Sequence, residues 1–177
     1  TEPMVQAAKK LVDATGMGKI FFANSGAEAN EGMIKLARKY SFDKYGEGRN
    51  KIITLKQSFH GRTVTTLKAT GQDKFHQYFF PFTEGFDYAA ANDIEDMKRK
   101  SDGTTCAVMM EMIQGEGGVR PATKEFLQGL RDLCEEMFAA MKELKTTEFM
   151  SEGFAVLPHP DMSPSAAYEQ LVLDNVE

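Results

Sequence analysis

Hydrophobic residues are arranged along this chain in two patterns, short continuous runs and longer stretches with a helical period. The runs "KIFFA" (19–23) and "KIITLK" (51–56) are rich in aromatic or β-branched residues, which predicts two short buried strands. The run "TTCAVMMEMI" (104–113) predicts a third buried strand. Stretches with apolar residues three and four positions apart separate these runs and predict helices.

Four longer helices are predicted, and they cover residues 3–15, 26–45, 91–100 and 123–145. The apolar side of the last one carries Phe126, Leu130, Leu133, Met137, Met141 and Leu144. A shorter helix is predicted inside "SFHGRTVTTLKATG", after an opening loop.

Two stretches lack a regular period. Residues 72–90 are aromatic and irregular, which predicts a folded loop. From about Thr146 the periodicity fades, and only "PSAAYEQLVL" is predicted to form a short helix.

Strands that alternate with helices predict an α/β fold with a mostly parallel sheet covered on both faces. In such sheets ligands bind beyond the carboxyl ends of the strands. Three glycine-containing loops, "NSGAE" (24–28), "SFHGRT" (58–63) and "QGEGG" (114–118), leave the three predicted strands at that end. We therefore expect these loops to converge on one site.

The first loop allows two interpretations. Ser25 followed by Glu28 forms a capping box, in which Gly26 only makes the turn. Alternatively, the small residues Gly26 and Ala27 leave the first backbone N–H groups of the helix uncovered, and the helix dipole favours a phosphate there. The segment has neither the lysine of a Walker loop nor the GxGxxG pattern.

The other two loops offer groups for a planar, charged ligand. Phe59 could be a core aromatic or could stack on a ring, and His60 could be a loop residue with satisfied hydrogen bonds. Arg62 could hold a carboxylate with two parallel hydrogen bonds. Glu111 ends an apolar run, where an acid is costly unless it is paired. Glu116 lies between glycines, either as a solvated acid in a tight turn or as part of a site.

The composition excludes several other classes. The net charge of −5 and a pI near 5.3 do not favour nucleic acid or an anionic membrane as a partner. No apolar run approaches the roughly 20 residues of a membrane span, and the chain does not begin with a secretory signal pattern. Cys106 and Cys134 lie in apolar patterns, which favours reduced core residues in a cytoplasmic protein, and the scattered histidines predict no metal site.

Taken together, "NSGAEANEGMIKLARKY", "SFHGRT", "ATGQDKF" and "EMIQGEGGVRPA" resemble, in order and spacing, the class III aminotransferases that use pyridoxal phosphate. Within that family they look most like the acetylornithine and succinylornithine aminotransferases. The resemblance covers residues 1–136 and implies part of the large domain of the fold type I transferases. It also implies the family reaction, amino transfer from N-acetylornithine to 2-oxoglutarate, and a homo-oligomer.

The resemblance also implies a role for each matched residue. Ser25, Gly26 and Ala27 would bind the cofactor phosphate. Phe59 would stack on the pyridine ring, with His60 beside it in the cofactor-binding loop.

Two further positions would contact the substrate. Arg62 would hold the α-carboxylate of the substrate. Glu116 would be the acid that, in relatives, pairs with a C-terminal arginine when no α-carboxylate is bound.

The sequence departs from the family in two respects. The segments with the pyridine-nitrogen aspartate and the Schiff-base lysine of the relatives have no counterpart in it, so no catalytic residue is assigned. Residues 137–177 resemble instead the C-terminal region of the ornithine, lysine and arginine decarboxylases, which points to a tail of separate origin. We therefore expect weak binding of pyridoxal phosphate and little or no turnover. The alternatives are a non-catalytic assembly module and a generic phosphate- or nucleotide-binding domain.

Overall fold

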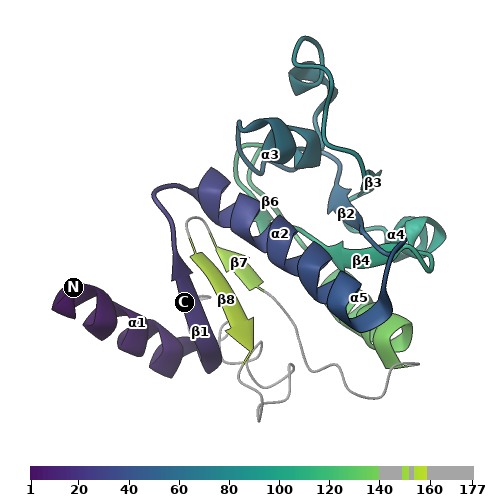
Figure 1. Cartoon of the computed structure of the whole chain (residues 1–177). Coiled ribbons are helices and arrows are strands. Elements are labelled where there is room, and N and C mark those ends of the chain that lie inside the picture. The colour runs from purple at the N-terminus through teal and green to yellow at the C-terminus, as the bar shows by residue number, and fades with distance from the viewer. Residues whose placement is uncertain (140–148, 152–153, 159–177) are drawn as a thin grey trace.

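The computed structural model describes residues 1–139, 149–151 and 154–158 (Figure 1). In chain order the elements are α1 (Glu2–Thr15), β1 (Met17–Phe22), α2 (Gly26–Tyr45), β2 (Lys51–Leu55), α3 (Val64–Ala69), the 3-10 helix η1 (Asp73–Phe75), β3 (Phe86–Ala89), α4 (Ile94–Lys100), β4 (Thr105–Val108), β5 (Ile113–Gln114), β6 (Arg120–Pro121), α5 (Lys124–Ala139), β7 (Phe149–Ser151) and β8 (Phe154–Pro158).

A parallel sheet in the order β3-β2-β4 forms the centre of the molecule. Four consecutive residues of its middle strand, β2, are buried. Since successive side chains of a strand point to opposite faces, β2 is buried on both sides. Ile53 and Leu55 pack with α4 and α5 on one face, and Ile52 packs with α2 and α3 on the other. The predicted α/β fold, with a parallel sheet flanked by helices, is confirmed.

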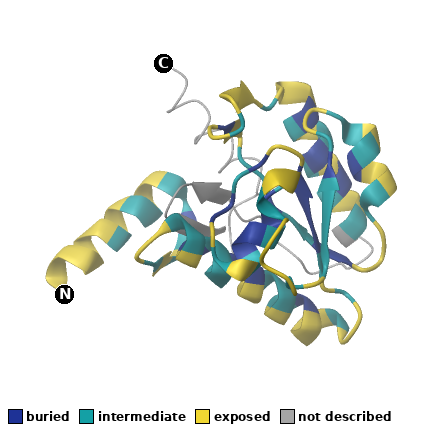
Figure 2. Ribbon diagram, turned by 90° about the horizontal axis from the view of Figure 1, so that it is seen from above, coloured by how far each residue is buried: buried dark blue, intermediate teal, exposed yellow. Residues whose placement is uncertain are grey.

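Two separate apolar clusters fill the space between the sheet and its helices. One joins β2 and β3 to α4 and α5, through Ile53, Leu55, Ala89, Met97, Phe126, Leu130 and Leu133. The other joins β2 and β4 to α2 and α3, through Ile34, Ile52, Ala69, Cys106 and Met109. Figure 2 shows this buried centre, and it shows α1 as a helix that extends away from it. In agreement, no residue of α1 is buried.

The two cysteines belong to different clusters on opposite faces of the sheet. Cys106 is buried among the residues against α2, whereas Cys134 packs against the cluster of α5. Burial raises the pKa of the Cys134 thiol, which keeps it protonated at neutral pH. Both are core residues, as the apolar pattern around them predicts.

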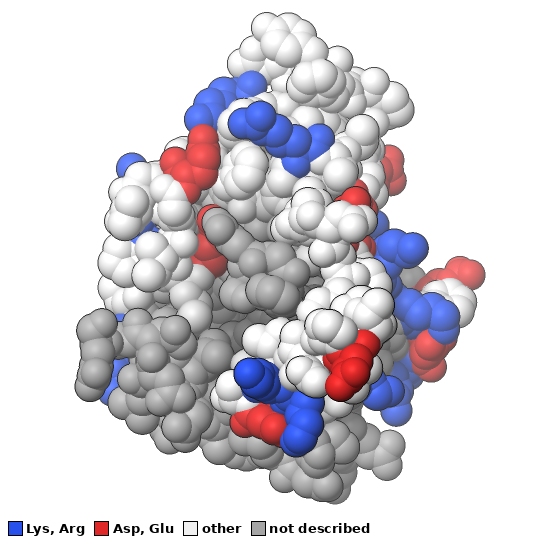
Figure 3. Space-filling view, turned by 90° about the vertical axis from the view of Figure 1, so that its left-hand side faces the viewer, with Lys and Arg blue, Asp and Glu red and all other residues white. Residues whose placement is uncertain are grey.

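The charges on one face of the molecule are mixed, and the described helices are not of the membrane-spanning kind. On the face shown in Figure 3, acidic and basic side chains are interspersed among uncharged ones. None of the described helices combines the length and the apolar character that crossing a membrane requires.

The first predicted strand does not join the central sheet. β1 pairs in antiparallel fashion with β8, in a second sheet of order β1-β8-β7, although the sequence pattern places it next to the parallel strands. From Gly18 onward its residues alternate between partly buried and exposed, and Phe21 is 54% exposed, so it is not the fully buried strand that its apolar run predicts. The tail supplies the pairing partner, which the pattern of residues 19–23 cannot indicate.

Three other expectations need correction. The irregular segment 72–90 contains the strand β3, whose Phe86 and Tyr88 were attributed to a loop. The third predicted strand is shorter, because β4 ends at Val108 and β5 begins a separate hairpin with β6. The tail, expected to be helical or irregular, contributes β7 and β8.

Some expectations lie outside the described residues. The end of the last predicted helix beyond residue 139 and the helix expected in "PSAAYEQLVL" are of this kind. The separate origin of residues 137–177 stays a prediction.

Gly71 provides a test of how tightly the chain after α3 lies against β2. A Cβ added there would come within 2.0 Å of the Leu55 carbonyl oxygen, whereas one added at Gly103 would meet no atom within 4 Å. We expect Gly71→Ala to lower the free energy of unfolding by about 1–3 kcal/mol. The control Gly103→Ala should change it by less than about 0.5 kcal/mol. Urea denaturation measures both, and equal values would contradict the close approach.

Candidate functional site

The first loop places a capped helix start after β1. Ser25 has an extended backbone, and its hydroxyl oxygen accepts a hydrogen bond from the amide of Glu28 at 3.2 Å. The Glu28 carboxylate accepts one from the amide of Asn24 at 2.7 Å. The expected capping interaction is therefore present, with Glu28 reaching one residue further back than a capping box requires.

The cap leaves the next two amides unused. Among the described residues, none accepts a hydrogen bond from the backbone N–H of Gly26 or Ala27. Both lie in the first turn of a 20-residue helix, where the dipole is positive. This end of α2 therefore offers two donors and a favourable field to an anion.

The second loop lies directly against this helix start. The side chain of Asn30 donates a hydrogen bond to the His60 carbonyl oxygen at 2.7 Å. A Cβ at Gly61 would lie 2.7 Å from the Cβ of Ala27, and Gly61 has a φ of +128°. Only glycine allows both the backbone angle and the close approach, which explains the glycine of "SFHGRT".

Phe59 and Arg62 belong to this second loop, and Phe59 contacts the segment that precedes the third loop. The Phe59 amide donates to the Glu111 carboxylate at 2.9 Å, so the acid at the end of the apolar run is paired as its position demands. The Phe59 ring is partly buried and meets Phe75 edge to face, with the ring centroids 6.1 Å apart. Arg62 is exposed, and its guanidinium carbon lies 6.0 Å from the centroid of the Phe59 ring.

The glycine-rich third loop connects β5 to β6 and lies against the start of the second loop and the segment around η1. A Cβ at Gly117 would lie 2.3 Å from the carbonyl oxygen of Gln57, the residue before "SFHGRT". The Glu116 carboxylate accepts hydrogen bonds from the side chains of Gln72 and, at 3.2 Å, Lys74. Gln72 first, then Lys74, lower the pKa of this carboxyl below its ordinary value. The second loop is thus packed against the first on one side and the third on the other, while the convergence of all three on one ligand stays a prediction.

Several residues at this site were missed by the sequence reasoning. Gln72 is 5% exposed and also donates to the Ser58 carbonyl oxygen. Thr70 accepts from the amide of His60 at 2.9 Å. Gln114 donates to the Lys56 carbonyl oxygen at 2.9 Å, while its own buried oxygen has no partner among the described residues. For Gln72, the only signal in the sequence is that a polar residue stands in "ATGQDKF" beside apolar runs.

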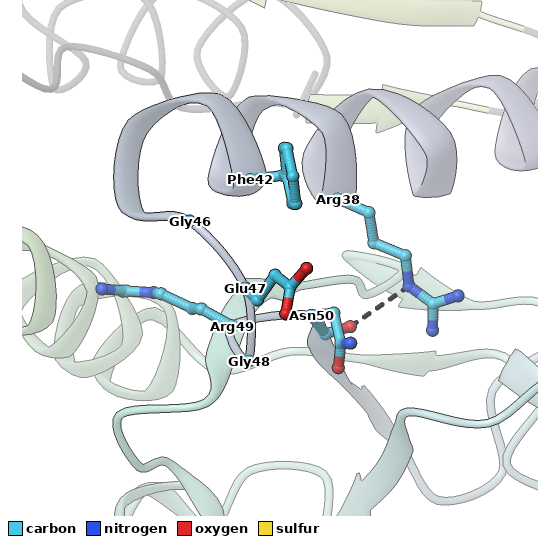
Figure 4. Close-up of a pocket in the computed structure, with 7 residues that line it drawn as sticks. All are labelled: Arg38, Phe42, Gly46, Glu47, Gly48, Arg49 and Asn50. Carbon is cyan, nitrogen blue, oxygen red and sulfur yellow. Dashed lines mark hydrogen bonds between the residues drawn. The ribbon is translucent and has the colours of Figure 1, made fainter.

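A hollow in the surface lies away from these three loops. It measures about 430 Å³ and is lined by Arg38, Phe42, Gly46, Glu47, Gly48, Arg49 and Asn50, around the last turns of α2 and the chain leading to β2 (Figure 4). A helix of 20 residues is about 30 Å long, so this hollow is far from Gly26. Arg38 donates to backbone oxygens of Asn50 and Glu84, which gives it a structural role.

His60 is buried inside the second loop rather than presented to a ligand. Its side chain is 4% exposed, and its Nε2 atom has no hydrogen-bond partner among the described residues. Burial lowers the pKa of His60 from 6.5 to about 4, because the charged imidazolium ring would lose its hydration.

This burial predicts a pH-dependent loss of stability. In the unfolded chain His60 binds a proton below about pH 6.5, whereas in the folded chain it stays neutral to about pH 4. The free energy of unfolding should therefore fall as pH decreases through this window, by about 2 kcal/mol at pH 5 from this group. His60→Gln should remove that part of the difference between urea denaturation at pH 7 and pH 5. Parallel pH profiles for the two proteins would contradict the neutral, buried state.

Comparison with known sequences identifies a family and relatives that this chain resembles. The family described as aminotransferase class III matches residues 1–141. An acetylornithine aminotransferase from Haemophilus ducreyi is 55% identical over 167 residues, which cover 89% of this chain and 42% of that protein. A succinylornithine transaminase from Salmonella paratyphi B is 52% identical over 134 residues, which cover 76% of this chain and 33% of that protein. The chain thus spans less than half the length of these curated relatives.

Solved structures agree with this assignment. The ornithine aminotransferase of Toxoplasma gondii ME49 superposes with a TM-score of 0.70 at 28% identity, over 75% of this chain and 32% of its own. A second structure of the Toxoplasma enzyme has pyridoxal phosphate in partial occupancy at its active site. A transaminase from the marine bacterium Virgibacillus reaches a TM-score of 0.75 at 20% identity, over 100% of this chain and 48% of its own, which shows the fold. The chain belongs to the class III aminotransferases, a family whose cofactor is pyridoxal phosphate.

Proposed function

We propose that this chain carries the phosphate-binding and carboxylate-binding part of an aminotransferase that acts on an N-acylated ornithine and 2-oxoglutarate. The observation that carries the proposal is the pair of unused amides at Gly26 and Ala27, with a ring and a guanidinium in the loop packed against them. The names of the acetylornithine and succinylornithine relatives support the substrate class. We place the protein in the cytoplasm on the same family grounds.

The residues present fit pyridoxal phosphate. The Gly26 and Ala27 amides would donate to its phosphate, with Ser25 beside them as the cap that keeps the helix start in place. The partly buried Phe59 ring would stack on the pyridine ring. His60 would act indirectly, since its carbonyl oxygen ties this loop to Asn30 of α2. When bound, the cofactor supplies an electron sink for the carbon that loses a proton.

Arg62 would bind the substrate. Its exposed guanidinium forms no hydrogen bond or ion pair with a described residue, so its donors remain for a carboxylate. We expect the chain by itself to bind the cofactor weakly and to show little turnover, because none of its lysines matches the one that binds the cofactor covalently in the family it resembles.

The phosphate grip can be tested with an added negative charge. Aspartate is tolerated in the first turn of a helix, so Gly26→Asp should fold, yet it should repel a phosphate there. We expect it to weaken pyridoxal phosphate binding at least about tenfold, measured by the ligand-induced shift in Tm and by calorimetry. Gly103→Asp adds the same charge in open space and should leave binding unchanged.

Two further ligands complete this test. Pyridoxal without the phosphate should bind equally weakly to the original chain and to Gly26→Asp. Stronger stabilisation by a nucleotide than by pyridoxal phosphate would favour the generic phosphate-binding alternative. A borohydride-trapped adduct on one lysine, together with amino-group exchange, would overturn the expected inactivity.

A second function, self-association, is favoured by one observation. The segment between η1 and β3 extends from the body of the molecule (Figure 1). Its side chains include large apolar ones that are exposed. Tyr78 is 80% exposed, Phe79 56% and Phe80 68%. Contiguous exposed apolar surface of this kind is typical of an interface, and a homo-oligomer is the proposed state.

Light scattering tests this proposal. Replacing Tyr78, Phe79 and Phe80 together with serine should shift the mass toward that of a single chain. Phe42→Ser removes an aromatic that is 54% exposed at the other end of α2, and it should leave the mass unchanged. A single-chain mass for the unchanged protein would refute self-association.

A further inference from the structure

Arg62 and the ion-pair partner of Glu116 lie over two aromatic rings in contact. Arg62 lies 6.0 Å from the centroid of the Phe59 ring, which meets Phe75 edge to face, and the Lys74 ammonium lies 4.7 Å from the Phe75 centroid. The guanidinium of Arg62 is among the groups that lower the pKa of the Glu116 carboxyl. A carboxylate within reach of an arginine competes with any carboxylate ligand for the same donors. The binding of an anion at Arg62 therefore depends on where Glu116 is held.

Both oxygens of Glu116 are engaged by other side chains. Oε2 accepts a hydrogen bond from the Gln72 amide, and Oε1 lies 3.2 Å from the Lys74 ammonium. Arg62, by contrast, donates no hydrogen bond to a described residue, and its guanidinium lies over the Phe59 ring.

One partner of Glu116, Gln72, is itself held in place. Gln72 is buried, and the same Nε2 atom donates to the Ser58 carbonyl oxygen at 3.1 Å. The backbone next to Glu116 cannot shift toward "SFHGRT", because Gly117 already lies against the Gln57 carbonyl oxygen. The position of the carboxylate is thus fixed both by the backbone of its own loop and by Gln72 in the segment around η1.

We propose that Gln72 and Lys74 are positioning residues that hold Glu116 away from Arg62 and so keep Arg62 available for a substrate carboxylate. This inference rests on the proposed role of Arg62. Gln72 supplies the directional hydrogen bond from a buried amide, whereas Lys74, with 60% of its side chain exposed, supplies the charge. Without Lys74, the Glu116 carboxylate has Arg62 as its remaining cationic neighbour.

The experiment uses the full chain with pyridoxal phosphate, and N-acetyl-L-ornithine as the carboxylate probe. Lys74→Met keeps the length of the side chain and removes its charge. We expect its Kd for the probe to rise about two- to fivefold, the size of an exposed ion pair between Arg62 and Glu116 that must first break. The same variant should shift the Arg62 Nε–H signal in NMR spectra without ligand.

Two controls separate position from net charge. Adding Glu116→Gln to Lys74→Met should restore both the Kd and the Arg62 signal. Lys9→Met removes one positive charge from an exposed Lys9–Asp13 pair of 2.8 Å on α1, and it should change neither. If the double variant binds as weakly as Lys74→Met, Lys74 attracts the ligand directly and the positioning role is overturned.

The remaining outcomes distinguish this inference from the proposed function. If Arg62→Met abolishes probe binding while Lys74→Met changes neither Kd nor the Arg62 signal, the proposed function stands and the inference fails. If Arg62→Met leaves binding unchanged, the carboxylate role of Arg62 fails. The Arg62 signal in Lys74→Met then still decides, without ligand, whether Lys74 keeps Glu116 off the guanidinium.

Discussion

Burial of β2 between two layers of helices is the constraint on which the rest of the structure depends. Its residues from Ile52 to Leu55 are at most 1% exposed, and they alternate between the cluster against α2 and α3 and the cluster against α4 and α5. A strand buried on both faces must be covered on both, so α2 and α3 cover one face and α4 and α5 cover the other. The loop that leaves this strand is thereby held at the carboxyl edge of the sheet, where the candidate site forms.

At that edge, glycines without a side chain let the loops approach one another closely. Gly61 lies against Ala27, and Gly117 lies against the Gln57 carbonyl oxygen, so each loop approaches the next more closely than any other residue would permit. The hydrogen bond from Asn30 to the His60 carbonyl oxygen and the one from the Phe59 amide to Glu111 then fix the relative positions of the three segments. The polar side chains of the site are therefore carried by a rigid frame.

Much of this architecture could be predicted from the sequence, because the relevant signals are local. The helix over residues 26–45 has the bounds that its cap and its terminal glycine indicate, and the central parallel sheet flanked by helices follows from the alternation of strands and helices. The strand β3 was missed because its four residues lie in an aromatic stretch without period, and its pairing with β2 is a long-range property. The pairing of β1 with β8 likewise depends on a distant segment. At the site, Phe59, Arg62 and Glu116 could be found from their loops, whereas Gln72 and Lys74 became visible only through their contacts.

The glycines of the loops have a consequence for how this site can diversify. Since the distances between the loops are set by main-chain contact at Gly61 and Gly117, exchanging the side chains at neighbouring positions does not require the loops to move. Charge and size at the mouth of the site can change while the amides at the start of α2 keep their place. If these amides hold a phosphate as proposed, one backbone frame would accept ligands that share a phosphate group and differ in the rest of the molecule.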